Sequence, residues 1–123
     1  MSDVLIIEDD EGIAQLLEFM MQREGHTVQV CRDGSAAEQR INTGPAPALV
    51  IMDVMLPYKD GFELIALLRA RPGWGQVPVL MLSAKSQEPD IVRALDAGCN
   101  GYVVKPFQPQ EVMARARQLM AAP

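Results

Sequence analysis

Four consecutive acids follow an apolar run in the stretch VLIIEDDE, residues 4–11, near the start of the chain. The apolar part, Val4–Ile7, lacks polar alternation, which is typical of a strand buried on both faces of a parallel sheet. Asp10 and Glu11 are expected to cap the helix that follows and to complement its dipole. The stretch therefore predicts a strand with Glu8 and Asp9 at its carboxyl end.

Four more short apolar runs recur along the chain, at Val28–Cys31, Leu49–Met52, Val77–Leu82 and Tyr102–Val104. Stretches with helical spacing of apolar residues, or a short polar stretch at 35–42, separate them. The apolar stripes are Ile13, Leu16, Leu17, Met20 and Met21, then Leu64, Ile65, Leu67 and Leu68, then Ile91, Ala94 and Leu95, and last Val112, Ala116 and Leu119. With right-handed crossovers, this alternation predicts an α/β fold, a (βα)5 doubly wound sandwich around a five-stranded parallel sheet.

Length and composition limit the class of protein. The 123 residues suit one domain, residues 1–123, and 49% hydrophobic with 22% charged residues excludes a disordered chain. Sixteen acids against 11 bases give a net charge of −5, which argues against binding to a phosphate backbone. No uncharged apolar run approaches the roughly 18 residues of a membrane span. The separated Cys31 and Cys99 match no metal spacing and fit a reducing compartment, so we expect a cytoplasmic protein without membrane contact.

Polar side chains stand at the carboxyl ends of four predicted strands. They are Glu8 and Asp9, Asp53, Ser83, and Lys105. Ligands bind at this edge of an open parallel sheet. Carboxylates about 4 Å apart repel by about 4 kcal/mol at an effective dielectric of 20, so they need a cation, and an all-oxygen site favours Mg²⁺. The remaining strand end offers Arg32 and Asp33, to which the pattern assigns no role.

In four segments the sequence resembles the receiver domain of two-component response regulators. The segments are 4–11, 49–57 with Asp60-Gly61, 79–85 and 102–107. One segment alone is a weak signal, but all four in this order and spacing are specific. The resemblance covers essentially the whole chain and is closest to the winged-helix DNA-binding subfamily. It implies a flavodoxin-like strand order, 2-1-3-4-5.

The resemblance implies a phosphoacceptor switch in a phosphorelay. Asp53 would take a phosphoryl group from a histidine kinase phosphohistidine or from a small phosphodonor. Mg²⁺ would be the cofactor, with Asp9, Asp53 and the backbone carbonyl of Met55 as ligands and Glu8 acting through a water. The chain would be no enzyme beyond catalysing its own phosphorylation and dephosphorylation.

The resemblance also implies how the switch would work. Lys105 would pair with Asp53 at rest and with the phosphoryl oxygens afterwards. Ser83 would hydrogen-bond the phosphoryl group, and Tyr102 would change its rotamer with it. The expected output surface is the face formed by the predicted helix around 91–95, the strand 102–104 and the helix around 112–119.

The expected partners are a sensor histidine kinase or a phosphotransfer protein. A homodimer through the output face is a further possibility, because Arg93, Asp96, Glu111 and Arg115 match parts of the charged pattern of such dimers. Asn100-Gly101 stands where two acids are usual, so an ordinary solvated face has equal weight. DNA would be contacted through an output domain outside this chain, and the sequence leaves open whether such a domain follows.

Three other classes of protein are alternatives that the residues fit less well. A metal-dependent phosphatase with an Asp nucleophile usually has a second carboxylate two residues on, where Met55 stands here. A flavin-binding electron carrier needs phosphate-binding hydroxyl and glycine residues where residues 8–11 would repel a phosphate. An unphosphorylated interaction module has no need for the complete set of polar residues.

Overall fold

Five strands and five helices alternate in the computed structural model, which describes residues 2–85 and 87–121. The strands are β1 (Asp3–Ile7), β2 (Thr27–Cys31), β3 (Leu49–Asp53), β4 (Val79–Ser83) and β5 (Gly101–Val104). The helices are α1 (Glu11–Arg23), α2 (Gly34–Thr43), α3 (Gly61–Ala70), α4 (Glu88–Ala97) and α5 (Pro109–Ala121). All strands pair in parallel, in the order β2-β1-β3-β4-β5. The predicted fold and strand order are confirmed.

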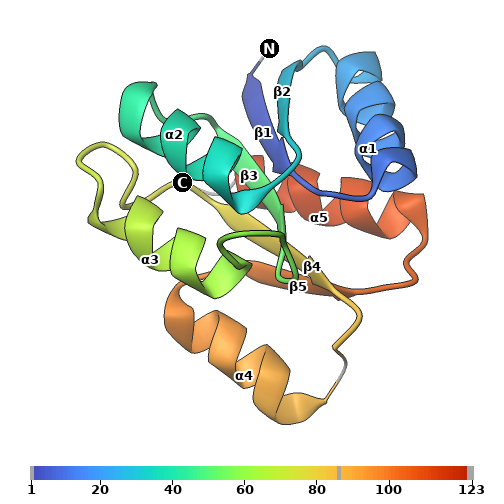
Figure 1. The fold of residues 1–123 in the computed structure, drawn as a ribbon. Helices are drawn as coiled ribbons and strands as arrows, with labels where there is room; N and C mark the ends of the chain where they lie inside the picture. The colour runs from blue at the N-terminus through green and yellow to red at the C-terminus, as the bar shows by residue number, and fades with distance from the viewer. Residues whose placement is uncertain (1, 86, 122–123) are drawn as a thin grey trace.

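The helices cover both faces of the sheet, α1 and α5 on one face and α2, α3 and α4 on the other (Figure 1). Alternate residues of β1 pack into the hydrophobic cores on the two faces of the sheet. Val4 and Ile6 belong to the core with α1 and α5, whereas Leu5 and Ile7 belong to the core with the other three helices. Burial on both sides explains why the strand is apolar at every position from 4 to 7.

Two of the predicted helix stripes are too wide. Leu16 and Leu95 were expected to be buried, but they are 38% and 48% exposed. In α1 the buried line is Ala14, Leu17 and Met21, because the sheet covers only the part of the helix that these residues present.

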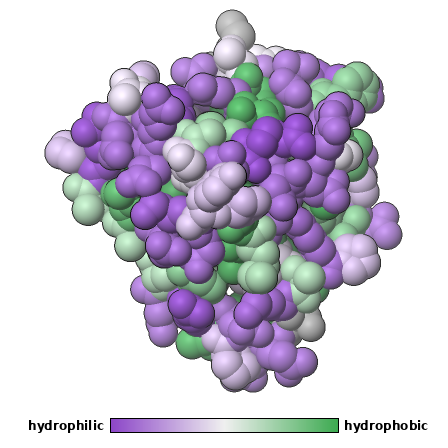
Figure 2. Space-filling model, viewed as in Figure 1, coloured by the Kyte–Doolittle hydropathy of each residue, from purple (hydrophilic) through white to green (hydrophobic). Residues whose placement is uncertain are grey.

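Hydrophilic side chains dominate the face of the molecule seen in Figure 2. No helix of the described residues is long and apolar enough to cross a membrane.

One predicted strand began two residues too early. Val77 directly follows a turn, which its amide closes by donating to the carbonyl of Trp74, and β4 begins at Val79. Pro78 has no N–H to contribute to the sheet, but its carbonyl accepts a bond from Val50. The parallel register aligns Ile7 with Met52 and Asp53 with Leu82, so the segments after β1, β3 and β4 emerge at one edge.

Candidate functional site

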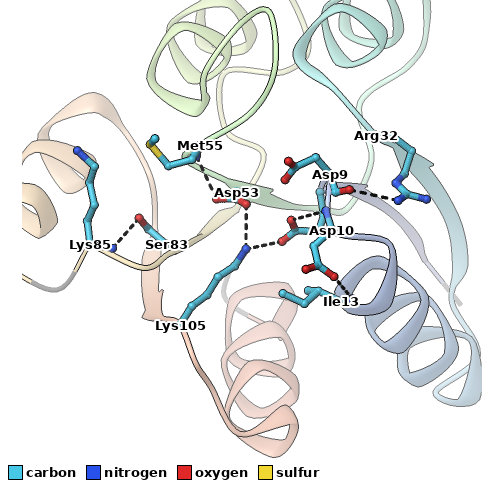
Figure 3. A network of polar contacts seen from close by, with 10 residues as sticks. Asp9, Asp10, Ile13, Arg32, Asp53, Met55, Ser83, Lys85 and Lys105 are labelled. Carbon is cyan, nitrogen blue, oxygen red and sulfur yellow. Dashed lines mark hydrogen bonds and ion pairs between the residues drawn. The ribbon is translucent and has the colours of Figure 1, made fainter.

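Three carboxylates meet at this edge of the sheet. Glu8 and Asp9 follow β1 and Asp53 ends β3, and one oxygen of each lies within 4.8 Å of the others. Glu8 and Asp53 are buried, and Asp9 is exposed. Asp10 points away and caps α1, accepting a bond of 3.0 Å from the amide of Ile13 (Figure 3). The first two acids of residues 8–11 therefore belong to the cluster, and the third belongs to the helix.

Lys105 lies between two of these carboxylates. Its ammonium Nζ donates to Asp53 Oδ2 at 2.8 Å (Figure 3). The same Nζ donates to Glu8 Oε1 at 2.9 Å. The pairing with Asp53 was expected from the sequence, and the pairing with Glu8 was not. A count of charges gives the missing signal, because a single lysine at an edge with three acids can pair with more than one of them.

Burial and pairing shift the pKa values of Glu8 and Lys105. Burial raises the pKa of Glu8 to about 7, although hydrogen bonds from Lys105 and from the Asp10 amide act against the rise. Burial alone would lower the pKa of Lys105, but its bonds to Asp53 and Glu8 raise it above the usual value. Lys105 therefore stays positively charged beside the carboxylates at neutral pH.

The loop from β3 to α3 folds back tightly over Asp53. The Met55 amide donates to Asp53 Oδ1 at 3.0 Å, while the Met55 side chain is 59% exposed. Gly61 closes the loop with a bond of 2.8 Å to the Val54 carbonyl. A Cβ atom on Gly61 would lie 2.8 Å from the Asp53 carbonyl oxygen, so a larger residue would push the loop away. This contact explains the glycine at position 61, while Asp60 caps α3 by accepting a bond of 2.9 Å from the Glu63 amide.

Ser83 and Tyr102 are connected through the backbone of Lys85. The Ser83 hydroxyl, which is fully buried, accepts a bond of 3.0 Å from the Lys85 amide. The Tyr102 hydroxyl donates to the Lys85 carbonyl at 2.8 Å. Figure 3 shows Ser83 on the opposite side of Asp53 from Asp9. The role of Lys85 as the connecting residue was missed, because backbone bonds leave no trace in residue type.

The donors of this cluster fit a magnesium ion. Three carboxylates and one ammonium leave a net charge of −2 when all are ionised, and all the candidate ligand atoms are oxygens. Mg²⁺ prefers oxygen ligands and is usually bound by one or two carboxylates with several waters. The chemistry of the residues therefore suits this ion better than a metal that prefers nitrogen or sulfur.

The family comparison agrees with this geometry. A family model described as the response regulator receiver domain matches residues 4–117. The chain belongs to this family. The receiver domain is the phosphoacceptor switch of two-component systems, and the order of strands and the polar residues at the sheet edge fit that function. Family membership thus favours this function over the phosphatase, the electron carrier and the unphosphorylated module.

The receiver domain has relatives among curated regulatory proteins. It is 39% identical to the DNA-binding response regulator MtrA of Mycolicibacterium smegmatis, over 93% of this chain and 48% of that protein. It is 38% identical to the transcriptional regulatory protein PhoP of Bacillus subtilis, over 95% of this chain and 48% of that protein. These relatives confirm the resemblance to DNA-binding regulators. The chain spans about half the length of the curated relatives it matches.

Solved receiver domains share the fold. The Francisella response regulator 1452 receiver domain superposes with a TM-score of 0.89 at 32% identity, covering 98% of this chain and 97% of the other. The receiver domain of the sensor histidine kinase PA1611 from Pseudomonas aeruginosa PAO1 superposes with a TM-score of 0.88 at 26% identity, covering 98% of both chains. The latter structure has a magnesium ion coordinated in its active-site cleft.

Proposed function

We propose that residues 1–123 form one receiver domain in which Asp53 is the phosphoacceptor. The observation that carries this proposal is the setting of the Asp53 carboxylate, which is buried and fixed by Lys105 Nζ at 2.8 Å and by the Met55 amide at 3.0 Å. Two more acids lie within 4.8 Å of it. A carboxylate held in this way at the edge of the sheet is oriented for reaction with an incoming group.

The reaction is a transfer of one phosphoryl group. An Asp53 oxygen forms a bond to phosphorus while the bond from phosphorus to the donor breaks, and the donor leaves with the electron pair of that bond. The donor is the phosphohistidine of a sensor kinase or phosphotransfer protein, or a small molecule such as acetyl phosphate. Lys105 is already in contact with Asp53 and stabilises the added negative charge. The catalysis is confined to the domain's own phosphorylation and dephosphorylation.

The ligands of the magnesium ion would be Asp9, Asp53 and the Met55 carbonyl, with Glu8 acting through a water. When bound, the ion supplies positive charge that offsets the carboxylates and the phosphoryl oxygens. The oxygen-only cluster and the magnesium ion in the related PA1611 receiver domain support this assignment. Lys105 pairs with both Glu8 and Asp53, so its ammonium competes with the ion for these two carboxylates.

Phosphorylation shifts a conformational equilibrium that Ser83 and Tyr102 control. The Ser83 hydroxyl donates to the phosphoryl group, and Lys105 keeps a second contact with it. Two charge-assisted bonds of about 1.5–3 kcal/mol each only just reach the ~5.5 kcal/mol that a complete switch needs. The response is therefore a graded population shift on the face of α4, β5 and α5.

The output face would contact a second copy of the receiver domain, and DNA would be reached through an output domain outside this chain. Support for the DNA contact comes from the relatives, since MtrA is a DNA-binding regulator and PhoP is a transcriptional one. The two free and buried cysteines fit action in the cytoplasm, where thiols stay reduced.

Incubation with acetyl phosphate and Mg²⁺, followed by intact mass measurement, tests this function. The native chain is expected to gain the mass of one phosphoryl group, and Asp53→Ala is expected to gain none. Asp96→Ala is the matched control, because it removes an exposed acid of α4 and should be phosphorylated like the native chain. No mass gain in the native chain, or an equal gain in Asp53→Ala, would contradict the proposal.

A further inference from the structure

The connection between β2 and α2 contacts both loops that carry the carboxylate cluster. Among the described residues, the carboxylate cluster consists of Glu8, Asp9 and Asp53, and none of them belongs to this connection. Arg32 follows β2, Asp33 caps α2, and Gly34 is the first residue of that helix. The sequence assigned these residues no role, but their contacts reach Asp9 on one side and the loop after Asp53 on the other.

Gly34 is packed directly against the backbone of the β3–α3 loop. Its amide donates to the Pro57 carbonyl at 3.0 Å, and that carbonyl also accepts from the Lys59 amide at 2.9 Å. A Cβ atom on Gly34 would lie 2.0 Å from the Lys59 carbonyl oxygen and 2.6 Å from the Lys59 nitrogen. Because these are backbone atoms, no change of rotamer relieves the overlap, and the loop or the helix would have to move.

The start of α2 is itself fixed in place. The Asp33 carboxylate accepts a bond of 2.7 Å from the Ala36 amide and so caps the helix. The Lys59 ammonium lies 3.6 Å from the Glu38 carboxylate of α2, which adds an ion pair between the helix and the loop. A side chain at position 34 would therefore be accommodated by movement of the loop that begins at Val54.

Arg32 makes the second contact. Its guanidinium NH2 group donates to the backbone carbonyl of Asp9 at 3.2 Å, from the side of Asp9 away from Asp53 (Figure 3). The connection thus touches the segment after β1 through Arg32 and the segment after β3 through Gly34.

We infer that Gly34 is a positioning residue for the metal site, with Arg32 as a weaker second one. The inference rests on the proposed function, in which the Met55 carbonyl and the Asp9 carboxylate bind Mg²⁺. Gly34 lets the loop approach α2 closely enough to hold Met55 beside Asp53, and Arg32 holds the backbone of Asp9. Residues that orient metal ligands commonly change metal affinity about 10–100-fold when they are replaced.

Gly34→Ala tests the inference, with Gly75→Ala as the matched control. The nearest atom to a Cβ on Gly75 is the Arg69 carbonyl oxygen at 3.8 Å, an ordinary contact, and Gly75 lies in the α3–β4 connection, away from the cluster. In the metal-free protein, Gly34→Ala should shift the amide resonances of residues 54–61. Mg²⁺ titration should then show an affinity lower by about tenfold. Gly75→Ala should leave both readouts unchanged.

The dependence of phosphorylation on Mg²⁺ separates positioning from a purely structural role. With acetyl phosphate, Gly34→Ala should need about tenfold more Mg²⁺ for the half-maximal rate and should approach the native rate when Mg²⁺ is saturating. Arg32→Gln replaces an exposed side chain, so this variant should fold like the native chain. Loss of the hydrogen bond from Arg32 to the Asp9 carbonyl should raise the Mg²⁺ requirement by about two- to tenfold. This variant keeps the test valid if Gly34→Ala does not fold.

Two kinds of failure can be told apart. If the native chain neither binds Mg²⁺ nor gains a phosphoryl group, the proposed function is wrong. If the native chain does both, and the variants that fold bind Mg²⁺ with native affinity, the positioning role is wrong. A lower melting temperature of Gly34→Ala with unchanged Mg²⁺ affinity would also overturn it, because that result assigns Gly34 to stability alone.

Discussion

Tyr102 holds the backbone of Lys85 through a hydrogen bond of 2.8 Å from its hydroxyl to the Lys85 carbonyl. The amide of the same residue donates to the Ser83 hydroxyl at 3.0 Å. A serine hydroxyl can donate one bond while it accepts others, so Ser83 can reach a phosphoryl oxygen and keep its bond from Lys85. Movement of Ser83 toward the phosphoryl group would then pull Lys85 along and strain its bond to Tyr102.

Removal of the Tyr102 hydroxyl should loosen this connection. We expect Tyr102→Phe to lower the free energy of unfolding by about 0.5–1.5 kcal/mol, because the ring packing remains and one hydrogen bond is lost. Urea unfolding of the unphosphorylated protein measures the effect. Tyr58→Phe is the control, since that side chain is 86% exposed and its variant should match the native protein. Equal stability of the two variants would show that the bond to Lys85 contributes nothing.

Loss of the Lys105 ammonium should leave two buried carboxylates without their shared partner. We expect Lys105→Met to lower the free energy of unfolding by about 3 kcal/mol at pH 8 without Mg²⁺. Mg²⁺ should restore much of this loss and should bind at least as tightly as to the native chain, because its competitor is gone. Thermal unfolding with and without Mg²⁺ measures both effects. A variant that Mg²⁺ stabilises less than the native chain would contradict this competition.

The exposed side chain of Met55 should affect how long phospho-Asp53 survives. Met55 lies two residues after Asp53, and its exposed side chain presents apolar surface beside the cluster. This apolar surface hinders an attacking water. We expect phospho-Asp53 to be hydrolysed severalfold faster in the Met55→Asn variant, because the side-chain amide of asparagine can orient the water. Decay of the phosphorylated mass after removal of acetyl phosphate gives the rate. Met55→Leu is the control of similar size and polarity, and an equal rate in all three proteins would rule out this role.

Much of the site was predictable because parallel strands end at one edge. Glu8, Asp53 and Lys105 were assigned to that edge from their positions after apolar runs, and the structure brings their side chains into contact. Contacts through the backbone were not predictable. Gly34 packs on the backbone of Lys59, and Lys85 uses its own amide and carbonyl to bond with Ser83 and Tyr102. The residue types at positions 59 and 85 therefore give no indication of these contacts.

The structural role of Asn100 could also be assigned only from its hydrogen bonds in the structure. From the sequence it was a lost charge on the output face, but its Oδ1 atom accepts bonds of 2.9 Å from the Val79 amide and from Arg69. Arg69 in turn donates to the carbonyls of residues 74, 75, 77 and 98. Asn100 thus belongs to a network that joins the loops before β4 and β5.

Two substitutions of Asn100 should separate this network from the role of charge. We expect Asn100→Ala to lower the free energy of unfolding by about 1–3 kcal/mol, because the Val79 amide and Arg69 lose their acceptor. Asn100→Asp keeps the acceptor and adds a charge beside Arg69, so its stability should equal or exceed that of the native protein. Chemical unfolding of the three proteins measures the order. Equal losses in both variants would show that the carboxamide itself is required.

The raised pKa of Glu8 should make both stability and Mg²⁺ binding depend on pH. The folded protein holds the Glu8 proton up to a pKa of about 7, whereas the unfolded chain releases it near the ordinary value of 4.5. The folded state therefore binds more protons between these values. The contribution of Glu8 to stability is largest below 4.5 and falls as the pH rises toward 7.

Mg²⁺ binding should show the opposite trend, because the ion binds more tightly when Glu8 is ionised and must displace the Glu8 proton below pH 7. With a pKa of about 7, we expect the dissociation constant for Mg²⁺ to rise by up to about tenfold between pH 8 and pH 6. Isothermal titration at both values measures the change. Glu8→Gln should bind Mg²⁺ more weakly at pH 8 but lose most of this pH dependence, and an equally steep dependence in that variant would assign the titration to another group.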